Sequence, residues 1–499
     1  MIAQSLSIPD ELGRQRSLAT GLSAYERLLP AVGGNSTGTL LLGAGPFPGE
    51  LAAAGALSAP IYYVECPDFE RALVQQRVPD DWIRIEPLAA AELAMRCAVW
   101  QYRQNIRLFN SFWGPILAQV RASRLGPIGA ASSSLVLLPG DEASLLTQEL
   151  ETSLTELGFR PLRLAEKDAL TQVSRLLREE RPLCLISVNG RGLGADGLLF
   201  RLLQSLDIPT AVWLVDNAWH VLGGWRQPWW KAAHLFVTDA SFVEPLRACG
   251  AQRVCHLPLG AWMPPPERDY EGPPVREISF VGRSAFPDKE KFFSGLRCDP
   301  ELLAEARCSA RPDFSWWLSR LEIKELWPGK DVRMAGFGAE TCSQQHRTDW
   351  LRAAADRLTV FGDAGWRALL DDAADIRPSV DYYTDLAAIY AASRYSLNIT
   401  SLLLPAGLTQ RHFDVWTSGG FLLMDATPGL HIFPSELVRP VCLEKPGDLL
   451  PAVERLERDP LLRQHLAEAW QACLTREHRL SHRLTSMLGQ MKLQERNRK

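Results

Sequence analysis

The most informative segment of this 499-residue chain is Thr409-Gln410-Arg411-His412-Phe413-Asp414-Val415-Trp416-Thr417-Ser418-Gly419-Gly420-Phe421-Leu422-Leu423-Met424-Asp425. It predicts a helix with a polar face, a glycine turn and a buried strand. Arg411, Asp414 and Ser418 recur at helical spacing, so their side chains share one face near the carboxyl ends of neighbouring strands, where open sheets bind ligands. The segment predicts an α/β nucleotide site in which Arg411 binds a diphosphate and Asp414 binds ribose hydroxyls. Alternatively, the two side chains only form an ion pair on an amphipathic helix, worth a few tenths of a kcal/mol.

Alternating strand-like and helix-like patterns extend through the chain and predict parallel sheets covered by helices. In the amino-terminal block we expect strands at 39–43 and 61–65 and a long helix at 89–109. The second block has five expected strands, at 135–140, 183–188, 211–216, 235–239 and 254–258. The third block has expected strands at 278–283, 358–363, 395–400 and 421–425, followed by helices from 449 onward.

A proline-rich segment separates the second block from the third. Residues 260–277 contain too much proline for a helix or a central strand, so we expect an interdomain linker there. The chain is also too long for a single core, at ~100–200 residues per domain. We therefore expect an amino-terminal α/β (Rossmann-like) extension at 1–131, a second domain at 132–262 and a third at 276–499.

The order Arg-x-Phe-acid, four residues, Gly-Gly and an apolar strand resembles the donor-binding segment of retaining-type GT-B glycosyltransferases, most closely the CgeB-like (spore-maturation-protein-like) family. Residues 208–217, with a proline, an apolar strand, Trp213 and Asp216, are similar to a stretch in the amino-terminal half of that family. Residues 452–483 resemble its closing helices. Asp414 stands where the family usually has glutamate, and Ala406 stands where many GT-B enzymes have a second one, so the resemblance implies no two-carboxylate mechanism.

The resemblance implies a GT-B fold, with two doubly wound Rossmann-like domains facing a cleft, plus the extra amino-terminal α/β domain. It implies transfer of a sugar from a nucleoside-diphosphate sugar, of UDP or GDP type, to a protein or cell-surface glycan acceptor. No cofactor or metal ion is expected to be required. The residues expected to bind the donor in this segment are Thr409, Gln410, Arg411, Asp414, Gly419 and Gly420.

Two strand ends of the third domain supply further donor-binding candidates. Gly282 lets the backbone approach a phosphate, and Arg283 can pair with it. Asn398 is expected to contact the donor or to orient the 409–414 segment. The alternatives are an ordinary strand-to-loop turn at Gly282 and Arg283 and a turn-forming asparagine at Asn398.

Asp216 and His220 are the candidate catalytic residues of the acceptor side. Asp216 ends an apolar strand, and burial beside aromatic residues would raise its pKa, which suits a base or an orienting carboxylate. His220 follows one helical turn later and is expected to share that role. Alternatively, Asp216 caps the next helix and His220 is structural.

A glycine loop near the start is a rival site. Gly43-Ala44-Gly45-Pro46-Phe47-Pro48-Gly49 follows a strand and precedes Glu65 by roughly the ~20-residue interval of a dinucleotide or S-adenosylmethionine pocket. Its prolines remove amides that bind phosphate, so a methyl donor fits better. The alternatives to a glycosyltransferase are thus an S-adenosylmethionine-dependent methyltransferase using the Gly43–Glu65 site and a non-catalytic GT-B-like module that binds glycans or partners.

Composition narrows the class of protein. The net charge of −4 gives no electrostatic basis for a nucleic-acid partner. The ten cysteines are scattered without Cys-x-x-Cys spacing, which indicates buried thiols in a reducing compartment and no metal site. The first residues lack a basic region followed by an apolar run, and no stretch reaches ~18 uninterrupted apolar residues. We therefore expect a cytoplasmic protein without a transmembrane segment.

Overall fold

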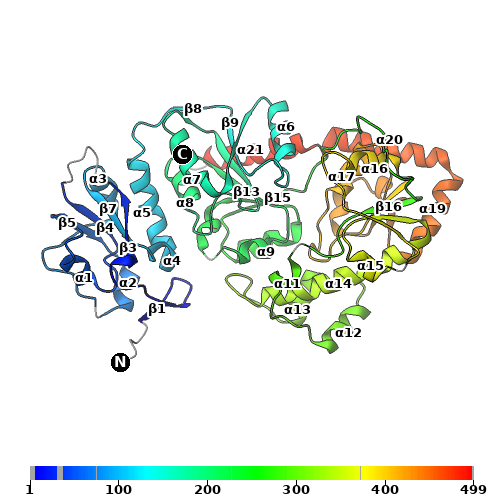
Figure 1. Ribbon diagram of the computed structural model, residues 1–499. Coiled ribbons are helices and arrows are strands. Elements are labelled where there is room, and N and C mark those ends of the chain that lie inside the picture. Colours follow the sequence, from blue (N-terminus) through cyan, green and yellow to red (C-terminus); the bar gives the residue numbers. More distant parts are fainter. Residues whose placement is uncertain are drawn as a thin grey trace.

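The computed structural model describes residues 6–30, 37–74, 76–225, 227–286, 288–370 and 372–496. Figure 1 shows three α/β units in chain order, the first in blue, the second in cyan and green, and the third in green to orange. The first contains a five-stranded sheet, and the other two each contain a six-stranded sheet. The expected fold class, with two doubly wound parallel domains and an additional amino-terminal α/β domain, is confirmed.

The first sheet has the order β3-β7-β4-β5-β6, and only β3 runs antiparallel to its neighbour. Its strands are β3 (Tyr25–Leu29), β4 (Thr39–Leu42), β5 (Ile61–Val64), β6 (Ile83–Arg84) and β7 (Ala98–Tyr102). A small hairpin of β1 (Ser7–Pro9) and β2 (Gln15–Ser17) precedes it. Its helices are α1 (Pro48–Ala53), α2 (Pro67–Ala72), α3 (Ala90–Ala94), α4 (Asn105–Leu108) and α5 (Asn110–Ser123).

The long helix expected at 89–109 is wrong, because β7 lies within it. β7 pairs with β3 on one side and with β4 on the other, and Ala98, Val99 and Tyr102 are buried. A short apolar run of this kind fits a strand or a buried helix equally well when only its sequence is considered. The strands expected at 39–43 and 61–65 correspond to β4 and β5.

The second sheet is parallel, in the order β10-β9-β12-β13-β14-β15. Its strands are β9 (Leu135–Pro139), β10 (Arg160–Leu164), β12 (Cys184–Val188), β13 (Thr210–Leu214), β14 (His234–Val237) and β15 (Arg253–His256). Its helices include α6 (Thr147–Glu156), α7 (Ala169–Leu176), α8 (Leu198–Ser205), α9 (Ala218–Gly223) and α10 (Val243–Ala248). All five expected strands are present. The sixth, β10, was missed because it is an edge strand that fully buries only Leu164.

The third sheet is also parallel, in the order β18-β17-β16-β19-β20-β21. Its strands are β16 (Ile278–Val281), β17 (Leu358–Phe361), β18 (Asp375–Arg377), β19 (Tyr395–Asn398), β20 (Leu422–Asp425) and β21 (Cys442–Leu443). Its helices include α12 (Pro300–Cys308), α13 (Phe314–Arg320), α14 (Val332–Arg352), α16 (Leu386–Ala392) and α17 (Arg411–Thr417). The strand order reverses between β16 and β19, and open sheets bind ligands at the carboxyl ends of such a pair.

Three helices close the chain: α19 (Leu449–Arg458), α20 (Pro460–Glu477) and α21 (Leu480–Arg496). α20 packs against α17, where the fully buried rings of Trp416 and Trp470 stack with centroids 5.1 Å apart and planes 4° apart. Gln471 on the same helix donates a hydrogen bond to the carbonyl of Trp416 over 3.0 Å. The helix that carries Arg411 is therefore fixed from behind by α20.

The last helix returns to the second domain. α21, red in Figure 1, packs against α6. At the point of return, the amide of Ala261 donates to the carbonyl of His478 over 2.8 Å, and the amide of Leu480 donates to the carbonyl of Ala261 over 2.9 Å. The chain therefore crosses between the second and third domains twice, and the two crossings are hydrogen-bonded to each other. Among the described residues, no helix combines the length and the apolar character needed to span a membrane.

Candidate active site between the second and third domains

Arg411 begins α17 and connects the two strand ends at which the third sheet reverses its order. Its Nε donates to Oδ1 of Asn398 over 2.7 Å, and its Nη1 donates to the carbonyl of Val281 over 2.9 Å. Its Nη2 has no hydrogen-bond partner among the residues that the structure describes. Burial lowers the pKa of Arg411, so the site holds a desolvated cation, which attracts an anion more strongly than a solvated one.

Asp414 lies one helical turn further along α17 and does not pair with Arg411. Its carboxylate is 1% exposed and accepts hydrogen bonds from the Tyr382 hydroxyl at 2.5 Å, Gln410 Nε2 at 3.0 Å and the amides of Trp262 and Met263 at 3.4 and 3.3 Å. Burial raises the pKa of Asp414 to about 6. The ion-pair alternative is therefore wrong. The Asp414 carboxylate instead holds Tyr382 and the linker residues Trp262 and Met263 in place. A ribose hydroxyl that bound to the Asp414 carboxylate would have to share its oxygens with these four protein donors.

Asn398, Thr409 and Gln410 hold the start of α17 in place. Asn398 is fully buried, and its Oδ1 accepts from Arg411 and from the Thr409 hydroxyl, the latter at 2.9 Å. Gln410 Nε2 donates to the carbonyl of Gly260 over 2.8 Å. The contacts of Asn398 with Thr409 and Arg411 therefore orient the 409–414 segment. The bond from Gln410 to Gly260 connects the same segment to the linker between the second and third domains.

Gly282 and Arg283 follow β16 directly. The Gly282 amide donates to the carbonyl of Phe361 over 3.0 Å, and a Cβ at this position would approach the Phe280 ring to 3.1 Å. Arg283 is exposed. Arg347, which the sequence did not suggest, reaches the same place from α14 and donates through Nη2 to the carbonyl of Ser284 over 3.0 Å. No local pattern in the sequence indicates that α14 lies across this strand end.

Two adjoining cavities lie at these strand ends, with volumes of 530 and 620 Å³. They share four wall residues, Asp216, Gly282, Leu404 and Arg411. The larger, here the arginine cavity, is lined by Arg283, Arg347 and Arg411 and by two carboxylates, Asp216 and the buried Glu340, which lies 3.6 Å from Nη2 of Arg347. The smaller, here the carboxylate cavity, is lined by Glu149, Asp216, Asp414, Tyr382, Tyr383 and Tyr390. The cleft therefore has a cationic half and an acidic, aromatic half.

Asp216 lies where the two cavities meet. Its Oδ2 accepts from Asn189 Nδ2 over 2.7 Å, and its side chain is exposed to the cleft although neighbouring atoms crowd it enough to raise its pKa. The helix cap is the next residue, Asn217, whose side chain accepts from the amides of Trp219 and His220. The capping alternative for Asp216 is therefore wrong, and its carboxylate remains directed at the cleft.

His220 lines the arginine cavity, but its ring is packed among phenylalanines. Its centroid lies 5.0 Å from Phe292, 5.7 Å from Phe293 and 6.2 Å from Phe314. Burial lowers the pKa of His220 to about 4. A neutral imidazole in this environment is a poor proton acceptor, so its surroundings favour the structural alternative.

Gly419 and Gly420 are not brought to the cleft. They end α17 on the side away from Arg411 and line neither cavity. Gly419 has a positive φ of 89°, which glycine adopts at helix ends without strain. A Cβ on Gly420 would approach the carbonyl oxygen of Tyr390 to 2.8 Å. Their predicted role in donor binding is therefore not supported, because the polypeptide has to turn here before β20 begins.

Glu149 is an acidic side chain of the cleft that no local sequence pattern indicates. It lies in the first turn of α6, is 1% exposed, and accepts a hydrogen bond from the Tyr383 hydroxyl over 2.9 Å. Burial raises the pKa of Glu149 to about 7. α6 also carries Glu151 and Glu156, and spacing alone does not show which of the three is enclosed.

The raised pKa of Glu149 predicts a pH-dependent stability. Between about pH 4.5 and 7 the folded protein holds a proton that the unfolded chain releases, so the free energy of unfolding falls as pH rises through this window. Glu149→Gln should remove on the order of 3 kcal/mol of that fall. Urea unfolding at four pH values between 4.5 and 7.5 measures the slope, with Glu156→Gln on the same helix as control. An unchanged slope in Glu149→Gln would contradict the assignment.

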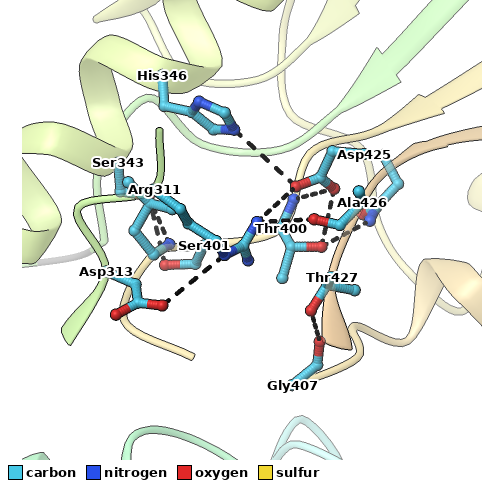
Figure 2. Close-up of polar contacts among 12 residues, drawn as sticks. Arg311, Asp313, Ser343, His346, Thr400, Ser401, Gly407, Asp425, Ala426 and Thr427 are labelled. Carbon is cyan, nitrogen blue, oxygen red and sulfur yellow. Dashed lines mark hydrogen bonds and ion pairs between the residues drawn. The ribbon is translucent and has the colours of Figure 1, made fainter. Parts of the chain in front are cut away.

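The loop between β19 and α17 is held from both sides. Asp425 accepts hydrogen bonds from the Thr400 amide at 2.8 Å and the Thr400 hydroxyl at 2.9 Å (Figure 2). Arg311 approaches the same carboxylate to 3.6 Å and donates to the carbonyl of Ala426 over 2.8 Å. From the second domain, Asn217 Nδ2 donates to the carbonyl of Leu403 over 2.8 Å. The cavity walls on this loop are therefore fixed to both domains.

The glycine loop of the first domain is occupied by protein groups. The Glu65 carboxylate accepts from the amides of Ala44 and Cys66, at 2.9 and 2.8 Å, and from Gln76 Nε2 at 3.0 Å. The Tyr25 hydroxyl donates to the carbonyl of Ala44 over 2.6 Å. The acid that would accept ribose hydroxyls in a dinucleotide or S-adenosylmethionine pocket thus already has partners.

One group of potential metal ligands occurs in the described part of the chain. Cys473, Glu477 and His478 have ligand atoms within 4.8 Å of one another. Arg476 pairs with Glu477 at 2.6 Å, and Arg483 contacts Nδ1 of His478 at 2.8 Å. These contacts engage two of the three groups, and the trio lines neither cavity.

Comparison with known proteins identifies part of the third domain. Residues 345–489 match the family model described as glycosyl transferase-like, and this stretch contains Arg347, Arg411 and Asp414. No curated protein matches the chain. Similar solved structures include the β-glucosyltransferase of phage T4 with UDP-glucose, at 10% identity and a TM-score of 0.39, covering 69% of this chain and 95% of that one.

Two others are HepE from Anabaena in complex with UDP-glucose, at 9% identity and a TM-score of 0.39, and a trehalose 6-phosphate synthase from Burkholderia multivorans, at 11% identity and a TM-score of 0.40. The first alignment covers 73% of this chain and 99% of that one, and the second covers 74% and 100%.

Proposed function

We propose that this chain is a glycosyltransferase of the CgeB-like family that transfers a sugar from a nucleoside-diphosphate sugar, of UDP or GDP type, to a protein or cell-surface glycan. The observation that carries the proposal is the arginine cavity, in which Arg283, Arg347 and Arg411 gather beside Gly282 at the strand ends where the third sheet reverses. The glycosyl transferase-like match over 345–489 includes two of these arginines and supports the same conclusion.

The proposed role of the arginines is to bind the diphosphate and to stabilise the charge that develops as it leaves. Arg347 and Arg411 each donate to backbone carbonyls at the carboxyl end of β16, so both are positioned before a donor arrives. Cations fixed in advance stabilise a developing anion without the cost of reorganisation. Arginine also matches phosphate oxygens with paired N–H groups. The proposal assigns this charge neutralisation to side chains, with no metal ion or cofactor.

Asp216 is the proposed base or orienting carboxylate. It lines both cavities, so it faces the junction at which a sugar bound beside the arginine cavity would meet an acceptor. Its raised pKa suits proton acceptance. In this proposal residues 132–262 form the acceptor side, residues 276–499 bind the nucleotide sugar, and residues 1–131 are an extension. His220 receives no role in proton transfer.

Ligand-dependent unfolding tests the proposal against both alternatives. UDP or GDP at ~100 times its dissociation constant should stabilise the protein by roughly 2.7 kcal/mol. The same nucleotide should stabilise Arg283→Ala less, since this exposed arginine is proposed to contact phosphate. Stabilisation by S-adenosylmethionine alone would assign function to the first domain. Stabilisation by glycans, with no response to any nucleoside diphosphate, would indicate a non-catalytic module.

A further inference from the structure

We propose that the carboxylate cavity is the acceptor site and that it takes an uncharged saccharide hydroxyl while excluding phosphorylated acceptors. This inference rests on the proposed function and specifies its acceptor class. Two of the three carboxylates that line the cavity, Glu149 and Asp216, come from the second domain, opposite the helix that carries Asp414. Arg411 is the single cation in the described lining, and it is shared with the arginine cavity.

The remaining walls of the cavity are apolar or aromatic. Leu146, Val215 and Leu259 line it from the second domain and the interdomain segment. Tyr382 and Tyr383 line it from the third domain, with rings 5.0 Å apart and nearly perpendicular at 88°. Aromatic faces beside carboxylates suit a sugar ring, which has apolar C–H faces and hydroxyls around its edge.

The neighbouring charges disfavour an anionic acceptor. A phosphate about 4 Å from one carboxylate would be repelled by about 4 kcal/mol at an effective dielectric constant near 20, and this cavity presents more than one carboxylate. Arg191 lies nearby, but its Nη2 is bonded to the carbonyl of Leu145, and burial lowers its pKa. A neutral hydroxyl meets no such repulsion, because it donates to a carboxylate.

Burial also argues against a site built for a cationic acceptor. Desolvation raises the pKa of Asp216 and raises that of Glu149 to about 7, so Glu149 carries only part of a negative charge near neutral pH. A hydroxyl can bond to either protonation state of these groups, whereas an ammonium ion needs the charged state. The Tyr383 hydroxyl already donates to Glu149, and its oxygen can accept from a sugar hydroxyl.

Transfer forms one bond and breaks one bond at the anomeric carbon of the donor sugar. The acceptor hydroxyl oxygen forms a bond to the anomeric carbon, and the bond between that carbon and the diphosphate oxygen breaks. The bond's electron pair leaves with the nucleoside diphosphate in the arginine cavity. The hydroxyl proton passes to the Asp216 carboxylate and then to solvent. No oxidant, reductant or further reactant is required.

Binding of matched probes tests the acceptor class without requiring turnover. Methyl glycosides of glucose, galactose, mannose and N-acetylglucosamine are compared with the 6-phosphates of the same sugars by saturation-transfer NMR, with UDP or GDP present. We expect at least one methyl glycoside to bind at least tenfold more tightly than its phosphate. Glu149→Gln should reduce the ratio of the phosphate's dissociation constant to the glycoside's about tenfold. Glu151 lies on the same helix but outside the cavity lining, so Glu151→Gln should leave this ratio unchanged.

The outcomes separate this inference from the proposed function. Sugar phosphates that bind as tightly as the glycosides would overturn this inference. So would a methyl glucosaminide, added as a cationic probe, that binds much more tightly than methyl glucoside. Failure of every glycoside to bind while a nucleoside diphosphate does bind would also overturn it and leave the donor assignment intact. If no nucleotide binds but the glycosides are still preferred to their phosphates, the proposed function fails and the saccharide site remains.

Discussion

Arg411→Ala is expected to lower kcat/KM for the nucleotide-sugar donor by roughly 100-fold or more. The substitution removes the cation shared by both cavities, and removal of one preorganised donor to a developing anion typically costs about 10²–10³ in kcat. It also removes a hydrogen bond to the Val281 carbonyl and one of the two hydrogen bonds that Oδ1 of Asn398 accepts, leaving the bond from Thr409. Donor hydrolysis or transfer, together with calorimetric binding of the nucleoside diphosphate, measures the effect.

Two variants separate loss of chemistry from loss of structure. Arg411→Lys keeps the charge but not the planar donor set, so it should fall between alanine and the wild type. Arg458→Ala removes an arginine that is 80% exposed on α19 and should change neither binding nor turnover. Because Arg411 is half-buried and holds two strand ends together, circular dichroism must show that the alanine variant folds. A folded Arg411→Ala with near wild-type donor affinity and kcat/KM would exclude Arg411 from the donor site.

Trp470→Ala is expected to lower the free energy of unfolding by about 3–5 kcal/mol. The side chain is completely buried, stacks on Trp416 and contacts Phe433 edge to face at 4.9 Å. Alanine would leave a cavity between α20 and α17 and an unpartnered carbonyl at Leu437, which now accepts from Nε1 of Trp470 at 3.2 Å. Equilibrium urea unfolding measures the loss.

The matched control lies on the same helix. Leu461 is 80% exposed, and Leu461→Ala should change the free energy of unfolding by less than about 0.5 kcal/mol. A loss of less than about 1 kcal/mol in Trp470→Ala would mean that α20 does not support α17 in the manner described. A large loss accompanied by weaker nucleotide binding would agree with the contact between α20 and the helix that carries Arg411.

Strands with continuous apolar runs could be predicted from the sequence, and those with few buried residues could not. β9, β12, β13 and β14 bury nearly every side chain, which leaves a clear local signal. β10 lies at a sheet edge and has the sequence Arg-Pro-Leu-Arg-Leu with one buried residue, so its identity depends on pairing with β9. β7 was misassigned for a different reason, since its apolar run becomes a strand only through its neighbours β3 and β4.

Some of the cleft residues could likewise be predicted from local sequence, and others could not. Arg411, Asp414 and Asp216 could be selected because each lies at a strand end or on a short helix beside one. Glu149, Arg347 and Tyr382 could not, because each reaches the cleft from an element whose position depends on tertiary packing. Gly419 and Gly420 are predicted as part of the donor segment, but they follow the carboxyl end of α17, whereas Arg411 lies at its amino end. The packing of distant elements determines which side chains meet in the cleft.

The double crossing at Ala261 restricts how the two halves of the cleft can move. A single tether would let the halves swivel and slide in any direction. Two chain segments are hydrogen-bonded to each other here, between Ala261 and both His478 and Leu480. We expect them to act as a paired joint with one bending axis, because the bonds between them resist twisting. Gln410 and Asp414 are bonded to this joint through Gly260, Trp262 and Met263, so the start of α17 lies close to the axis. Opening would therefore displace the far rim of the cleft most, while the residues beside Arg411 keep their relative positions.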